Sequence, residues 1–170
     1  MKKFNISSQE IELALSNYFG IRKNLIVPNV SWGLGIHECD LLILSKSGYC
    51  TEIEIKISLS DLKKDLLKSH SHKNDKIKYL YFCIPSYLAK HVEFIPKNAG
   101  ILIINSAHKI FKISESQKNI TANKLNDDEK FIVARLGALR IWDLKSKCIG
   151  YKNDRKYLLN KIEELKKVSS

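Results

Sequence analysis

The stretch Asp40–Lys56, DLLILSKSGYCTEIEIK, predicts two β-strands joined by a tight turn, and the fold is organised around this hairpin. Its second half alternates strictly, so that Glu52, Glu54 and Lys56 point to one side of the strand and the intervening isoleucines to the other. Asp40 opens the first strand of the pair. Carboxylates and an ammonium therefore converge on one side of a sheet whose other side is apolar. Because unpaired charges are costly beside a core, such a cluster is often functional.

A helix is predicted on each side of the hairpin. Ser7 and Glu10 have the spacing of a capping box at the start of a helix that runs to about Phe19. After the hairpin, the apolar spacing changes to that of a second helix, for which Ser60 and Asp61 are the expected cap.

Further strands complete the expected sheet. The proline within residues 25–30 confines that short strand to an edge or to a bulge. Residues 77–84 and 100–105 are almost continuously apolar, which is typical of buried strands, and residues 86–92 between them predict a short helix. Residues 109–113 predict an adjoining strand. This strand, helix, strand alternation is a crossover pattern. The expected fold class is therefore α/β, with a mixed central sheet flanked by helices.

The C-terminal part of the chain predicts extra helices. A polar loop precedes a helix that starts at Asp127 or Asp128. After a lapse in the pattern, a final helix over about Asp154–Lys167 carries apolar residues whose spacing suits docking on the core or on a partner helix. We therefore expect one domain over residues 1–150. A helical extension over residues 151–170 would pack on that domain or on a partner, for instance in a homodimer.

Composition restricts the class of protein. The chain has 170 residues and a formal net charge of +11 at pH 7, which favours a polyanionic partner such as DNA. The alternative explanation is a lysine- and isoleucine-rich composition that reflects an AT-biased genome. The four cysteines are scattered and form no Cys-x-x-Cys pair, which argues against a zinc ribbon and fits reduced thiols in a cytoplasmic protein. Neither a secretion signal nor a membrane-spanning run is expected.

Basic residues follow the carboxylate strand directly, which favours a DNA-binding surface there. The candidate nucleic-acid-binding residues are Lys63, Lys64, Lys68, His70, His72 and Lys73. The alternative for the lysines is an ordinary solvated helix face. The two histidines lack a third suitably spaced ligand, so a zinc site is not expected.

The residue types of the hairpin suit phosphodiester hydrolysis. Asp40 and Glu54 supply the hard oxygen ligands that Mg²⁺ (or Mn²⁺) prefers, and the backbone carbonyl of Ile55 is available as a third. Lys56 shares the face of Glu54, within reach of a metal-bound water or of the scissile phosphate.

Asp40, followed after thirteen residues by Glu54, Ile55 and Lys56, resembles the Asp…(Asp/Glu)-x-Lys signature of the PD-(D/E)XK nuclease superfamily. Residues 52–61 also resemble MmcB-like DNA-repair proteins and small phage and bacterial nuclease-fold proteins. The resemblance covers about half of the chain directly and implies a restriction-endonuclease-like core. It implies a metal-dependent endonuclease or other deoxyribonuclease in DNA repair, recombination or phage DNA processing. It also implies that Asp40 and Glu54 bind the metal and that Lys56 positions or activates the water.

Several alternatives stay open. The resemblance implies a further glutamate from the first helix, for which Glu12 is the first choice and Glu10, the capping residue, the second. Glu38 and Glu52 add carboxylates on the same face, so the ligand set can be shifted. The charges can instead form a cross-strand ladder on a solvated sheet face. The fold can also bind DNA without cutting it, or serve a partner-binding protein that dimerises through its terminal helix.

Overall fold

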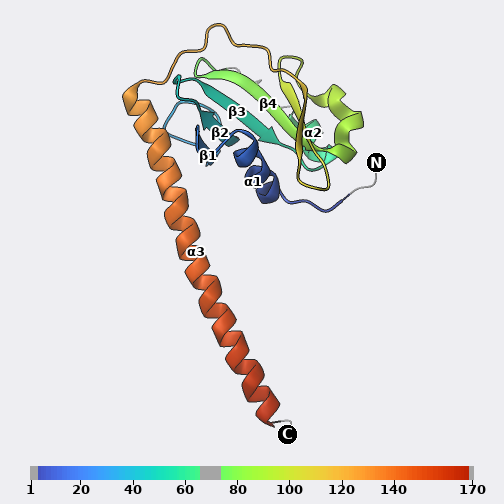
Figure 1. Cartoon of the computed structure of the whole chain (residues 1–170), viewed down its shortest axis with the longest axis vertical. Coiled ribbons are helices and arrows are strands. Elements are labelled where there is room, and N and C mark those ends of the chain that lie inside the picture. Colours follow the sequence, from blue (N-terminus) through green and yellow to red (C-terminus); the bar gives the residue numbers. More distant parts are fainter. Residues whose placement is uncertain (1–3, 66–73, 169–170) are drawn as a thin grey trace. The chain divides into compact units, whose positions relative to one another are not determined.

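The structure, a computed structural model, describes residues 4–65 and 74–168 of the chain, and its centre is one six-stranded mixed sheet (Figure 1). The strands lie in the sheet in the order in which they occur in the sequence. They are β1 (Leu25–Val30), β2 (Cys39–Leu44), β3 (Cys50–Ile55), β4 (Ile77–Pro85), β5 (Gly100–Ile104) and β6 (Ile110–Ser114). β3, β4 and β5 run parallel, and the other neighbouring pairs are antiparallel. The predicted α/β class with a mixed sheet is confirmed.

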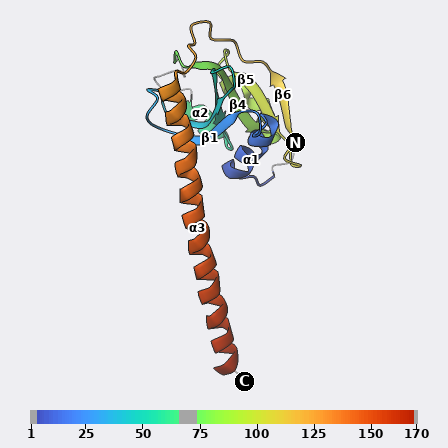
Figure 2. The ribbon, with the colours of Figure 1, turned by 60° about the vertical axis from the view of Figure 1, so that its left-hand side comes forward.

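Helices cover both faces of this sheet (Figure 2). On one face, α1 (Ser8–Tyr18) packs its buried Ile11 and Leu15 against the isoleucines of β3. On the other face, Leu62 of α2 (Leu59–Asp65) and Leu88 of the 3₁₀-helix η1 (Ser86–Phe94) pack against β4. Because the side chains of a strand alternate, the odd-numbered isoleucines of β3 belong to the first face and its glutamates to the second.

The predicted cap is correct for α1 and wrong for α2. The capping box of Ser7 and Glu10 is present as predicted. The cap of α2, however, is Ser58 and not Ser60 or Asp61. The Ser58 hydroxyl accepts the Asp61 N–H at 3.1 Å, so the helix begins closer to β3 than expected. The prediction of an edge position for β1, made from Pro28, is confirmed.

The C-terminal part is one helix, α3 (Asp127–Val168), and the predicted separate helix over about Asp154–Lys167 is wrong as a separate element. No proline interrupts the segment where the pattern lapsed, so helical hydrogen bonding continues through it. The chain forms two compact units, Met1–Ala134 and Arg135–Ser170, which are described separately below. The boundary expected at residue 150 lies inside α3.

No helix among the described residues combines the length and the hydropathy that crossing a bilayer requires.

Candidate active site

The three residues of the predicted signature lie together at one end of β2 and β3. The register of these strands places Leu42 opposite Glu52, and continuing it places Asp40 beside Glu54. An Asp40 carboxylate oxygen, Oδ2, accepts the backbone N–H of Ile55 at 2.7 Å. Lys56 Nζ donates to Glu54 Oε2 at 2.6 Å and lies 3.8 Å from Asp40 Oδ2. The ammonium therefore connects the two carboxylates that sequence reasoning selected as metal ligands.

A fourth member of this site, Asp65, was missed by sequence reasoning. Its Oδ1 lies 3.2 Å from Lys56 Nζ, and its side chain is only 2% exposed. Asp65 is the last residue of α2, three positions after the buried Leu62, so both share the side of the helix that faces the sheet. An acid within the apolar stripe of a helix was the available signal. Asp40, Glu54, Lys56 and Asp65 together are called the Lys56 cluster.

The Lys56 cluster is largely removed from solvent. Glu54 is 1% exposed and Lys56 is 5% exposed. The alternative of a cross-strand charge ladder placed these residues on a solvated sheet face, and that placement is wrong, because α2 and η1 cover this face. The pairing of Glu54 and Lys56 with neighbouring charges, which it also expected, is present. Asp40 is the exception, with 37% of its side chain exposed, and it gives the cluster its opening to solvent.

Backbone bonds hold Lys56 at this position although β3 ends at Ile55. The Lys56 N–H donates to the carbonyl of Cys83 at 3.1 Å, which extends the pairing of β3 with β4 by one residue. The carbonyl of Ile57 accepts the hydroxyl of Tyr87 at 2.9 Å. The chain then enters α2 at Ser58. The lysine is thus fixed between a sheet and the start of a helix.

Electrostatics keep Lys56 protonated. Burial alone would lower the pKa of its ammonium, but Glu54, Asp40 and Asp65 outweigh burial, so the pKa of Lys56 is raised above its ordinary value of 10.5. An ammonium that holds its proton at neutral pH does not serve as a general base. It can neutralise negative charge and orient a water or a phosphate oxygen.

The two candidate glutamates of α1 differ in their surroundings. Glu10 is exposed and its Oε2 accepts the Ser7 N–H at 2.8 Å, so its carboxylate belongs to the helix cap. Burial, and then the charge of Asp40, raise the pKa of Glu12. The charge of Asp40 acts on the carboxyl of Glu12, whereas that of Glu10 is governed by Ser7, and this difference favours Glu12 over Glu10.

Glu52 belongs to a separate pair. Its Oε1 lies 2.8 Å from Nε2 of His37, and its side chain is 1% exposed. His37 lies in the segment between β1 and β2, where Gly35 accepts a bond of 3.1 Å from the Asn74 side chain. Glu52 therefore holds this segment to the sheet. Glu38, which precedes β2, is exposed, and within the described residues no ion pair joins it to Lys56.

A metal ion needs several donor atoms that point toward one place. Within residues 4–65 and 74–168, no three side chains of His, Cys, Asp or Glu are arranged to hold a metal ion together. The Lys56 ammonium lies among the carboxylates instead. The chemistry still fits Mg²⁺, which commonly takes one or two carboxylates and keeps several waters. Asp40 is open to solvent, and three carboxylates around one ammonium leave an excess of negative charge.

Only part of the predicted DNA surface is described. Lys63 and Lys64 are exposed in the last turn of α2, where a positive charge also suits the helix dipole. Lys63 Nζ lies 5.0 Å from the centroid of the Phe94 ring of η1. The other four predicted contacts lie outside the described residues. These are Lys68, His70, His72 and Lys73.

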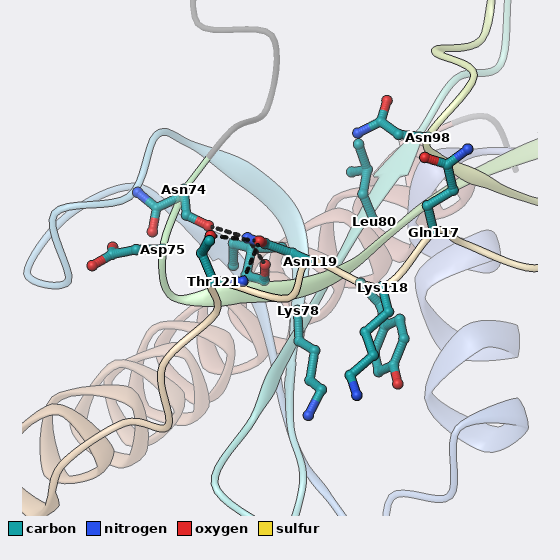
Figure 3. Close-up of a pocket in the computed structure, with 11 residues that line it drawn as sticks. Asn74, Asp75, Lys78, Leu80, Asn98, Gln117, Lys118, Asn119 and Thr121 are labelled. Carbon is teal, nitrogen blue, oxygen red and sulfur yellow. Dashed lines mark hydrogen bonds between the residues drawn. The ribbon is translucent and has the colours of Figure 1, made fainter.

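A cavity of about 440 Å³ lies elsewhere in the fold (Figure 3). Polar and apolar residues line it, mainly from the start of β4 and from the segment after β6, among them Lys78, Leu80 and Asn119. Because Cys50 pairs with Ile77 at the start of the parallel strands, this cavity lies at the opposite end of β3 from the Lys56 cluster.

The comparisons with known proteins bear on the fold. No family model matches the chain, and no curated protein matches it. A solved structure, the SPO1766 protein of unknown function from Silicibacter pomeroyi, is similar, with a TM-score of 0.59 and 15% sequence identity. The match covers 82% of this chain and 90% of that chain. At this identity the likeness shows a shared fold.

Proposed function

We propose that this protein is a metal-dependent deoxyribonuclease of the PD-(D/E)XK type. One observation carries the proposal. The Lys56 ammonium lies 3.8 Å from a carboxylate oxygen of Asp40 and 2.6 Å from one of Glu54. The order α1, three antiparallel strands, α2 and β4 agrees with the core that the resemblance implies. DNA repair, recombination or phage DNA processing would be its setting.

Asp40 and Glu54 are the residues that would hold Mg²⁺ or Mn²⁺, with the carbonyl of Ile55 as a third ligand and Glu12 completing the set. The metal would supply a water of lowered pKa and stabilise charge on the phosphate. Asp40 already has its Oδ2 fixed by the Ile55 N–H, so its carboxylate is held at the solvent opening before a ligand arrives. Such preorganisation reduces the cost of ordering a site.

Lys56 would act as a permanent positive charge beside the phosphate. Its raised pKa supports this role, because the ammonium neutralises the charge that develops on the phosphoryl oxygens and can orient the attacking water. Asp65 would position this ammonium from the side of α2. The excess of lysine over acids, with a net charge of +11, supports binding of the DNA backbone.

The test is a cleavage screen over single-stranded, duplex, flapped and four-way DNA, with and without Mg²⁺ or Mn²⁺. Asp40→Asn is the sharpest variant, because the partly exposed side chain can be replaced while its oxygen still accepts the Ile55 N–H. We expect at least a roughly 100-fold loss of cleavage, the scale of losing one preorganised charge interaction. Glu93→Gln, at an exposed carboxylate on η1, is the matched control and should keep full activity. Full cleavage by purified Asp40→Asn would overturn the proposal.

A second candidate, a DNA-binding module that does not cut, is favoured by one observation. The Lys56 ammonium lies among the three carboxylates and neutralises part of their charge, so the cluster already holds one cation of its own. Calorimetric titration with Mn²⁺ distinguishes the two candidates. Binding that Asp40→Asn weakens supports the nuclease, whereas no heat of binding at millimolar metal, together with salt-dependent DNA binding, supports the module.

A further inference from the structure

The second unit of the chain, Arg135–Ser170, carries a seam of side chains that alternates in steps of three and four residues along α3. The seam consists of Ile141, Leu144, Cys148, Tyr151, Arg155, Leu158, Ile162 and Leu165. All of these residues except Arg155 are apolar. A mean spacing of about 3.5 residues is the signature of a helix that winds around another helix in a left-handed coiled coil.

The seam is exposed along its whole length. The exposed fraction is 70% at Tyr151, 64% at Ile141 and 62% at Leu165. Trp142 and Ile149, exposed to 63% and 55%, each follow a seam residue by one position, so they lie about 100° around the helix from it and not in the seam. An exposed strip of this length, apolar except at Arg155, is typical of a surface that binds a partner. An isolated helix gains little stability from propensity alone, so the pairing would also stabilise α3.

The partner must offer a helix of comparable length. Within the described residues, the next longest α-helix is α1, with 11 residues, and its apolar side is already buried against the sheet. The seam spans residues 141–165, more than twice the length of α1. A second copy of α3 has both the length and the matching period.

We propose that α3 pairs with α3 of a second copy as an antiparallel coiled coil centred near Asn153. In this register each seam residue of one copy lies opposite a seam residue of the other copy. Ile141 faces Leu165 of the second copy, and Leu144 faces Ile162. Toward the centre, Cys148 faces Leu158 and Tyr151 faces Arg155. The pairing goes beyond the proposed nuclease function and does not depend on it.

Arg155 is the residue that selects the antiparallel arrangement. In a parallel, in-register pair, Arg155 would face Arg155 of the second copy, and two like charges would meet inside the seam. In the antiparallel register, the guanidinium lies against the ring of Tyr151, where a cation–π contact is favourable. The polar residue in the seam therefore sets direction and register, as single polar residues do in other coiled coils.

The single exposed cysteine of the seam gives a direct test. Cys39, Cys50 and Cys83 are buried, so Cys148 is the thiol available for mild oxidation. In the proposed pair, the two Cys148 residues are about ten residues apart along the axis, about 15 Å, which is too far for a disulfide. The wild type should therefore not crosslink, whereas Leu158→Cys should form intermolecular disulfides between its introduced thiol and Cys148. Asn160→Cys, on the outer face of the helix, is the matched control and should not crosslink.

Mass measurement completes the experiment. We expect the full-length chain to have about twice its mass of 19.5 kDa in light scattering at about 100 µM. The double variant Leu158→Asp, Ile162→Asp should halve that mass, and Asn160→Asp, on the other side of the helix, should not change it. A monomeric wild type, or a Cys148–Cys148 bond in the wild type, would overturn the proposal. Neither readout involves DNA cleavage, so loss of the nuclease proposal would leave this result interpretable.

Discussion

The Lys56 cluster and α3 both depart from the usual pattern of a folded protein, in which charged residues are exposed and apolar residues are buried. In the first unit, Glu54 and Lys56 are charged and almost fully buried. In the second, Tyr151 and Ile141 are apolar and mostly exposed. Burying a charge costs free energy unless it is paired, and exposing a long apolar strip forgoes the free energy of burial. We propose that the buried charges serve chemistry and that the exposed apolar strip serves assembly.

The largest effect should come from removing the buried cation. Lys56→Met leaves three carboxylates without their ammonium, and breaking a buried pair of this kind costs about 3–5 kcal/mol. The pKa of Lys56 is raised in the folded state, so its stabilising charge is fully present below the unfolded value of 10.5 and is lost only as the pH rises through the higher folded value. Urea unfolding at pH 7 measures the loss.

The matched control for that measurement is Lys112→Met. Lys112 and Glu115 form an ion pair whose side chains are 42% and 67% exposed, so this change should cost less than about 1 kcal/mol. Equal losses for the two variants would contradict the account, because the buried and the exposed lysine would then contribute alike.

Replacing Asp65 tests whether this residue only positions the Lys56 ammonium. Asp65→Asn removes one charge from Lys56 but leaves Asp40 and Glu54 in place. We expect cleavage to fall by about 10- to 100-fold, as when a residue that orients a ligand is lost, while DNA affinity in Ca²⁺ stays within about twofold. Asp61→Asn, one turn earlier on α2, is the control. Unchanged cleavage by Asp65→Asn would remove this residue from the site.

A smaller effect is expected in α3. Gly150 lies inside the continuous helix, and a Cβ added there would meet no atom within 4 Å. Gly150→Ala should therefore stabilise the helix by about 0.5–1 kcal/mol, because alanine loses less backbone freedom. Thermal unfolding followed by circular dichroism at 222 nm measures the gain. A loss of helicity would indicate that the chain bends or ends at this position, where the apolar pattern of the sequence lapses.

The smallest effect should be at Glu12. Burial, and then Asp40, raise the pKa of this carboxyl, so its ionisation opposes folding once the pH exceeds 4.5. Glu12→Gln should stabilise the fold by a few tenths of a kcal/mol at pH 7 and have no effect at pH 3. If Glu12 completes the metal site, added Mg²⁺ should raise the melting temperature of the wild type more than that of the variant. An equal rise would exclude Glu12 from the metal site.

Sequence reasoning found what depends on local periodicity. The two-residue alternation of β3 identified Glu54 and Lys56 on one face, and the sheet register brought Asp40 to them. Asp65 lies within the apolar stripe of α2, but its contact with Lys56 depends on how this helix packs over the sheet, which the spacing alone does not give. The same limit applied to Glu52, whose partner His37 comes from another segment.

The continuity of α3 was missed for a different reason. At a period of 3.6 residues, the apolar stripe of this helix ends near Cys148. At a period of 3.5 residues, the stripe continues through Tyr151 and Leu158. The longer regularity is visible only when the helix is followed over several turns. The cap of α2 was predicted two or three residues too late. Its position at Ser58 follows the end of β3, and that end depends on pairing with β4.

The most direct measurement of the central claim is the rate of DNA cleavage as a function of Mg²⁺ concentration, for the wild type and for Asp40→Asn side by side. The account predicts cleavage by the wild type that rises with Mg²⁺ to saturation and disappears with chelator. Asp40→Asn should bind the same DNA but cut it at least about 100-fold more slowly. Wild-type DNA cleavage that is independent of metal, or equal rates for the two proteins, would contradict it.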